Sequence, residues 1–101
     1  MLALKLTPSD TVATVLEEAG PGDRVEFLVG REKNGESVEA KERIPFGFKI
    51  CAKRMEKGDV VLKYGVPIGR ATRAIEPGEL VHVHNIEGCR GRGDLGEEEA
   101  K

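Results

Sequence analysis

The chain has 101 residues, which is enough for one domain and too few for two. Its apolar share is 39%, with three Phe, one Tyr and no Trp, so the core must consist mainly of Val, Ile and Leu, a composition that favours β-strands. The formal net charge is −2 and the charges are interleaved, which argues against the concentrated basic face of a nucleic-acid-binding protein.

The N-terminal part has no recognisable signal peptide, and no apolar stretch approaches the length of a membrane span, so we expect a cytoplasmic protein without membrane contact. A helix is predicted over residues 9–19. Ser9 or Asp10 could cap its start and Gly20 its end. The alternative is an extended segment, because residues 11–15 are rich in β-branched side chains.

Strands follow along the rest of the chain. Residues 24–29 alternate polar and apolar side chains, as in a half-buried strand. The pair Asn34-Gly35 predicts a hairpin turn, with the return strand beginning near Val38. Further strands are predicted over residues 60–63, 68–71 and 80–86.

A degenerate repeat joins these strands. The pattern Gly, acid, any residue, apolar residue begins at Gly22, Gly58 and Gly78. Met55 and Ile75 precede the last two copies as apolar anchors. We interpret each copy as a strand, a tight turn closed by a glycine with positive φ, and a new strand. One turn design is thus reused inside a compact domain.

The end of the chain differs in composition. Residues 88–101 contain almost nothing to bury, so we expect a domain over residues 1–88 and a flexible polar tail over 89–101. Neither cysteine has a metal-binding spacing. Cys51 lies in an apolar run and is expected to be buried, whereas Cys89 lies in the tail.

Two groups of residues could carry chemistry. His82 and His84 would share one face of a strand and, followed by Asn85, could bind a metal or transfer protons. The alternative is an exposed face of a strand that buries Val81 and Val83. Lys63 and Tyr64, followed by glycine, could present an ammonium and a phenol to an anionic substrate, or form an ordinary strand edge. The chain contains no recognisable complete catalytic set.

Three runs, over residues 40–49, 61–72 and 78–85, appear in an order that resembles the SAF-type β-clip domain of altronate and galactarate dehydratases. The chain is also similar to the small subunits of altronate dehydratase and of (2R)-sulfolactate sulfo-lyase. The resemblance extends over residues 3–88. It implies a mostly β fold of short strands and hairpins, with at most one short helix.

The resemblance also implies a function. The chain would be the small subunit, or the N-terminal domain equivalent, of a hydro-lyase that eliminates water from a hydroxy acid with a separate large catalytic subunit. The alternatives are a sulfolactate sulfo-lyase small subunit and a non-enzymatic β-clip binding module. The enzyme could use a divalent metal, iron or manganese, whose ligand set the large subunit would complete. Whether several copies of this chain assemble is left open.

Site residues follow from the same resemblance. The resemblance implies catalytic roles for four residues: His82, His84, Lys63 and Tyr64. The two histidines would also be metal ligands. Three further residues would bind the substrate: Asn85, Lys49 and Arg70. One departure stands out. The family loop usually reads Pro-x-Gly-His-Lys, and Phe48 stands where that histidine would be. Phe cannot bind a metal or transfer a proton, so that histidine is dispensable, the substrate differs, or catalysis is absent.

Overall fold

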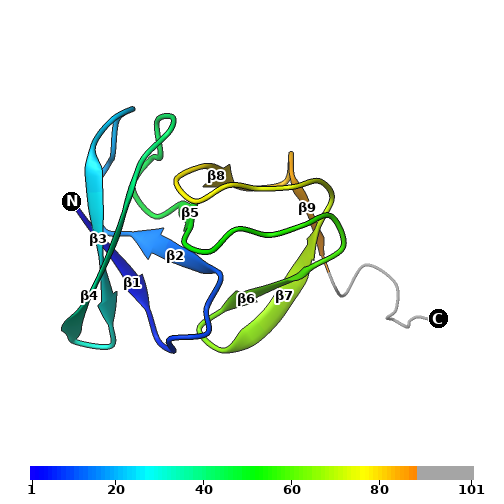
Figure 1. Cartoon of the computed structure of the whole chain (residues 1–101), viewed down its shortest axis with the longest axis horizontal. Helices are drawn as coiled ribbons and strands as arrows, with labels where there is room; N and C mark the ends of the chain where they lie inside the picture. The colour runs from blue at the N-terminus through cyan, green and yellow to red at the C-terminus, as the bar shows by residue number, and fades with distance from the viewer. Residues whose placement is uncertain (89–101) are drawn as a thin grey trace.

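A computed structural model describes residues 1–88, in which nine strands form two sheets (Figure 1). The six-stranded sheet has the order β4-β3-β1-β2-β5-β8 and the three-stranded sheet the order β6-β7-β9. The strands are β1 (Leu2–Lys5), β2 (Val12–Val15), β3 (Arg24–Val29), β4 (Glu32–Glu39), β5 (Lys49–Cys51), β6 (Val60–Lys63), β7 (Val66–Ala71), β8 (Leu80–Val81) and β9 (Ile86–Gly88). No helix occurs in this part of the chain, so none there is long and apolar enough to cross a membrane.

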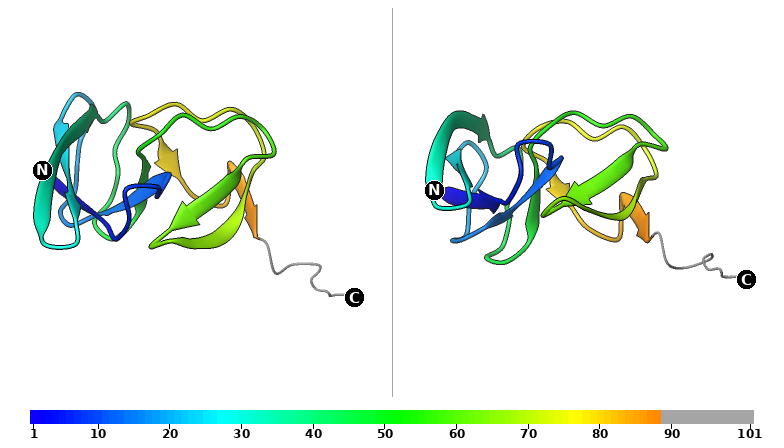
Figure 2. Two further views of the ribbon diagram at one scale, coloured as in Figure 1. Left: turned by 60° about the horizontal axis from the view of Figure 1, so that its bottom comes forward. Right: turned by 90° about the horizontal axis from the view of Figure 1, so that it is seen from below.

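The two sheets lie side by side, with the β3–β4 hairpin at one end and β6, β7 and β9 at the other (Figures 1 and 2). Strands β2 and β5 lie between them and are buried on both faces. Ala13 and Ile50 belong to one core cluster, whereas Val12 and Cys51 belong to a second. This placement explains why neither strand shows a clear polar–apolar alternation. The expected mostly β fold is confirmed.

The predicted helix over residues 9–19 is wrong. Residues 12–15 form β2, which is hydrogen-bonded between β1 and β5. Two paired neighbours satisfy the backbone of β2, and its β-branched side chains pack on both core clusters, so tertiary pairing outweighs any local helix preference. Asp10 caps a loop instead of a helix.

The hairpin predicted at Asn34-Gly35 exists but turns elsewhere. β3 pairs with β4 through Val29 and Glu32, so Gly30 and Arg31 form the turn. Asn34-Gly35 lies inside β4, near the register shift between Glu26 and Leu28. Gly35 has a φ of 85°, so the dipeptide serves the bulge and not the turn.

The predicted strands over 24–29 and 60–63 are confirmed as β3 and β6, and that over 68–71 lies within the longer β7. The strand predicted over 80–86 is wrong in its middle. β8 ends at Val81, a turn follows, and β9 joins the other sheet. The proposed tail and Cys89 lie outside the described residues, whereas Cys51 is buried as expected.

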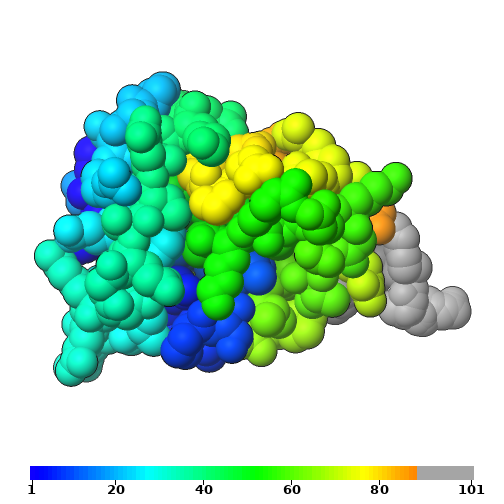
Figure 3. Space-filling model, viewed as in Figure 1, coloured from blue at the N-terminus to red at the C-terminus, as the bar shows by residue number. Residues whose placement is uncertain are grey.

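The predicted turn repeat is confirmed, and it has a fourth copy over residues 44–49. The four glycines adopt positive φ: Gly22 at 88°, Gly47 at 83°, Gly58 at 91° and Gly78 at 97°. The units pair through two isolated bridges, Ala19 with Ile44 and Met55 with Ile75. In Figure 3 the segment around residues 75–80 (yellow) lies against green segments, as expected from the hydrogen bond from the Gly78 N–H to the Cys51 carbonyl.

An acidic side chain closes three of these turns from within. Its carboxylate accepts a hydrogen bond from the backbone N–H three residues earlier: Asp23 from Gly20, Asp59 from Glu56 and Glu79 from Glu76. In the fourth unit the equivalent donor position is Pro45, which has no N–H. An acid at position 48 would have nothing to accept there. Phe48 is therefore compatible with the turn. Position 48 does not need the hydrogen-bond acceptor that Asp23, Asp59 and Glu79 provide in the other three turns.

Candidate functional site

The β6–β7 hairpin places Lys63 and Tyr64 at its tip. Lys63 pairs with Val66, so Tyr64 and Gly65 are the two turn residues. Both have positive φ, 56° and 77°, as a type I′ turn requires. The Lys63 ammonium lies 5.2 Å from the centre of the Tyr64 ring. The Tyr64 hydroxyl donates a hydrogen bond of 3.1 Å to Thr14 Oγ1 of β2.

Asp10 anchors this hairpin tip from the other end of the chain. Its side chain is fully buried and its carboxylate accepts hydrogen bonds from the backbone N–H groups of Tyr64 (2.9 Å) and Gly65 (2.7 Å). It also accepts from the Leu6 and Thr7 N–H groups and from the Thr7 hydroxyl. Burial opposes its ionisation, but these hydrogen bonds, led by that from Gly65, hold the pKa of Asp10 below its ordinary value.

Lys49 reaches the same region from β5. It is the register partner of Thr14 on β2, so their side chains are neighbours on one face of the sheet. Lys49 is partly buried, and this burial, together with the charge of nearby Lys63, lowers its pKa. The structure thus brings Lys49, Lys63 and Tyr64 together around Thr14.

The histidines lie in a turn, not on a strand as predicted. Asn85 organises this turn: its Oδ1 accepts from the His82 N–H at 3.0 Å and its Nδ2 donates to the Leu80 carbonyl at 2.8 Å. Asn85 is fully buried, and Val83, expected to be buried in the alternative reading, is 79% exposed. β8 ends at Val81, so the strand that was expected to place His82 and His84 on one face does not extend to them.

His82 packs against Phe48. Their ring centroids are 4.9 Å apart with planes tilted by 48°. Phe48 also packs on the core cluster that contains Ile50, whereas Lys49 lies between them in sequence and on the opposite face. The residue in the histidine position of the family loop is thus the direct neighbour of His82.

Within residues 1–88, no hydrogen bond, ion pair or ring contact joins four of the predicted residues to the Lys49–Lys63–Tyr64 group: His82, His84, Arg70 and Asn85. Arg70 pairs with Val60, at the end of the hairpin opposite its tip, and donates to the Gly58 carbonyl. The amide of Asn85 is used by its own turn. Their roles in substrate binding stay predictions.

Residues 1–88 contain no group of three or more His, Cys, Asp and Glu side chains that could hold a metal ion. His82 and His84, the predicted metal ligands, are therefore not part of such a group, and two ligands are fewer than a closed metal site requires. Burial, and then the charge of Glu79, raises the pKa of Cys51 to about 12, so its thiol stays protonated at neutral pH and is a poor metal ligand.

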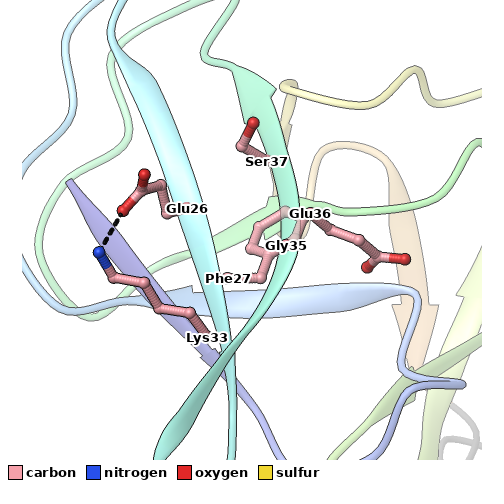
Figure 4. Close-up of a pocket in the computed structure, with 6 residues that line it drawn as sticks. All are labelled: Glu26, Phe27, Lys33, Gly35, Glu36 and Ser37. Carbon is pink, nitrogen blue, oxygen red and sulfur yellow. Dashed lines mark ion pairs between the residues drawn. The ribbon is translucent and has the colours of Figure 1, made fainter.

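A small surface hollow of about 80 Å³ lies at the β3–β4 bulge, and no predicted site residue lines it (Figure 4). Its charged lining includes the ion pair between Lys33 and Glu26, 3.0 Å long, in which each charge already has a partner. The bulge that displaces these two strands accounts for the hollow. It carries no chemistry that connects it to the residues above.

Sequence reasoning missed Asp10 and Thr14 as parts of the site. Asp10 and Tyr64 are 54 positions apart, and no local pattern links them. The one available signal was the pair Tyr64-Gly65. A two-residue turn with positive φ leaves its backbone N–H groups in need of acceptors, so the pair could have indicated that an acceptor such as Asp10 lies nearby.

Comparison with known proteins agrees with the resemblance. The family described as altronate/galactarate dehydratase SAF domain matches residues 1–88. Altronate dehydratase of Bacillus subtilis (strain 168) is 35% identical over 84 residues, which are 83% of this chain and 16% of that protein. The (2R)-sulfolactate sulfo-lyase subunit alpha of Chromohalobacter salexigens is 43% identical over 49 residues, 48% of this chain and 52% of that subunit. The chain thus spans a small part of one relative and about half of the other.

Proposed function

Because the chain belongs to the altronate/galactarate dehydratase SAF domain family, we propose that it acts as the SAF domain of a lyase that eliminates water from a hydroxy acid. A larger catalytic chain would carry the remaining part of the active site. The observation that carries this proposal is the family match, which extends over all described residues and includes both motif-bearing turns. It agrees with the lack of a complete catalytic set in residues 1–88.

In this proposal Lys49, Lys63 and Tyr64 face the carboxylate of the substrate. Elimination removes the proton from the carbon next to that carboxylate and expels a hydroxyl from the following carbon. Negative charge then accumulates on the carboxylate oxygens, where ammonium groups and a phenol O–H stabilise it most. His82 and His84 are candidates for proton transfer. A divalent metal would need most of its ligands from the larger chain, because residues 1–88 contain no group of three or more candidate ligands.

A sulfo-lyase activity is the second candidate. The two sulfo-lyase alpha subunits match at 43% and 44% identity, higher than the dehydratases, although over 49 and 48 residues only. The reaction would expel sulfite in place of water, and the same three residues would face the carboxylate. A third candidate, a binding module without catalysis, is favoured by Phe48, which gives His82 an aromatic neighbour where a second imidazole would stand.

Reconstitution with a large dehydratase-like chain from the same organism tests these candidates. We expect the pair to co-purify and to dehydrate a sugar acid such as altronate, while the large chain alone is inactive or much less active. A panel of altronate, galactarate and sulfolactate separates the dehydratase from the sulfo-lyase. Full activity of the large chain alone, without association, would leave only the binding module.

A further inference from the structure

The turn at Gly47 differs from its three counterparts in the side chain that it exposes. In all four turns the residue after the glycine donates its backbone N–H to the carbonyl two residues before the glycine. The position directly before the glycine is filled by Pro21, Lys57 and Pro77 in three turns and by Phe46 in this one. Proline pre-sets the backbone for that position and lysine is readily solvated, whereas phenylalanine gives the turn neither advantage. Phe46 is nevertheless 69% exposed, so the turn itself does not explain its ring.

The turn over residues 82–85 exposes a second apolar side chain. Val83 is 79% exposed, and Val83 and Phe46 are the two most exposed large apolar residues in residues 1–88. The hydrogen bonds of the buried Asn85 side chain hold this turn through the backbone of Leu80 and His82. The Val83 side chain is therefore not needed to form the turn.

The two turns lie at the same end of the strand pair β5–β8. Lys49 pairs with Val81 in this antiparallel pair, so the chain before Lys49 and the chain after Val81 leave the sheet together. The ring contact between Phe48 and His82 continues the pairing by one position.

Leu16 lies at this end of the sheet too, on the other side of β5. Val15 donates to the Phe48 carbonyl (2.9 Å) and accepts from the Gly47 N–H (3.0 Å). Leu16 is the next residue and is 41% exposed. Three exposed apolar side chains thus lie at one end of β2, β5 and β8. We call this end of the sheet the Phe46 surface; it comprises Leu16, Phe46 and Val83.

Charged side chains next to the Gly47 turn already have partners within the chain. Glu42 accepts a hydrogen bond from the Leu80 N–H (3.0 Å), and Arg43 pairs with Glu18 (2.6 Å). A partner that covers the Phe46 surface would leave these interactions intact. An exposed apolar patch with a polar rim is typical of a contact between proteins, and the chemistry that fits it is another apolar surface.

The comparison with relatives favours one occupant over others. In the Bacillus subtilis altronate dehydratase the matching region is 16% of the protein, so most of that protein lies outside it. The Phe46 surface also adjoins His82, a candidate for proton transfer that needs further groups to complete a site. A larger chain that supplies those groups has to cover the turn that contains His82.

We propose that the Phe46 surface is the docking surface for the larger catalytic chain, with Phe46 and Val83 buried against an apolar face of that chain. The identity of the partner rests on the proposed function. Burial of an aromatic and an aliphatic side chain stabilises such a complex, and side chains of this kind at the centre of an interface carry much of its binding free energy. The contact places the turn with both histidines at the boundary between the two chains.

The test measures binding of the full chain to a large dehydratase-like chain from the same organism by isothermal titration calorimetry. Phe46→Pro is the main variant, because it removes the ring and introduces the residue that two of the other turns have at this position. Phe46→Pro and Val83→Ser should each raise the Kd about tenfold or more. Lys57→Ser, at the equivalent exposed position of the Gly58 turn, is the matched control and should bind like the wild type.

Thermal melting of the same variants separates docking from folding. Phe46→Pro should keep or raise the melting temperature while it weakens binding, and Val83→Ser decides the matter if Phe46→Pro melts at a lower temperature. A wild-type Kd in both variants would overturn the docking surface and leave the proposed function standing.

Gel filtration of the chain alone tests the other occupant, a second copy of this chain. A wild-type dimer that Phe46→Pro converts to a monomer would assign the surface to self-association and overturn the proposal. A wild-type chain that does not bind the large chain would overturn it as well. Binding through the Phe46 surface by a pair without lyase activity would overturn the proposed function alone.

Discussion

Replacement of Gly78 by Ala is expected to lower the free energy of unfolding by about 3 kcal/mol or more. Gly78 has a φ of 97°, and a Cβ there would lie 2.1 Å from the Glu39 carbonyl oxygen. That oxygen belongs to the backbone, so no side-chain rotation can make room. The turn would have to separate from the chain around Glu39 and Lys41, where the Gly78 carbonyl accepts the Lys41 N–H.

Gly58→Ala is the matched control for this prediction. Gly58 has nearly the same φ, 91°, in the equivalent turn, but a Cβ there would meet nothing within 4 Å. Its replacement should cost only the strain of positive φ, about 1 kcal/mol. Urea denaturation of both variants measures the difference. If both variants lose the same free energy of unfolding, the close contact between a Cβ at position 78 and the Glu39 carbonyl oxygen relaxes without cost.

Replacement of Asp10 by Ala should also be costly, at about 2 to 4 kcal/mol. The change removes one carboxylate that accepts hydrogen bonds from two distant segments, the loop after β1 and the tip of the β6–β7 hairpin. Asp59→Ala is the control, because Asp59 accepts from one backbone N–H at an exposed turn and should cost about 1 kcal/mol. Chemical denaturation of the two variants gives the comparison, and a similar loss for both would contradict the anchoring role of Asp10.

Acid unfolding is a second way to measure how much the Asp10 carboxylate stabilises the fold. The pKa of Asp10 in the folded chain lies below its ordinary value of 3.8. A lowered folded pKa stabilises the fold above the unfolded value, and this contribution is lost as the pH falls through the folded value. Between neutral pH and strongly acidic pH, the wild type should therefore lose more stability than Asp10→Ala. Identical pH profiles of the two proteins would contradict the ionised, hydrogen-bonded carboxylate.

The parts of the fold that the sequence predicted correctly depend on local signals. Residues 24–29 and 60–63 have the strand pattern within themselves, and the strands β3, β6 and β8 begin two residues after the turn glycines Gly22, Gly58 and Gly78. Residues 12–15 could not be assigned in this way, because their conformation depends on pairing with β1 and β5. The strand predicted over 80–86 is wrong because the buried Asn85 side chain holds the backbone in a turn through its hydrogen bonds. In the sequence, Asn85 looks like an ordinary polar residue of a strand.

The candidate site likewise contains residues with a local sequence signal and residues without one. Lys63 and Tyr64 were recognisable because they are adjacent to a turn glycine, but the contribution of Asp10 arises from packing between segments distant in sequence. Phe48 looked like a defect in the family loop. The structure shows that this turn needs no acid at position 48, since Pro45 lacks the backbone N–H that would donate to it. Phe48 instead packs on the core cluster that contains Ile50 and against the His82 ring.

The most direct test of the account is the kcat/KM of the reconstituted enzyme with Lys63→Met in this chain. Lys57→Met is the control, and gel filtration checks that both variants still associate with the larger chain. If Lys63 faces the substrate carboxylate, kcat/KM should fall by about 10- to 100-fold while the complex stays intact. An intact complex with Lys63→Met and an unchanged kcat/KM would contradict the claim that this domain contributes to the active site.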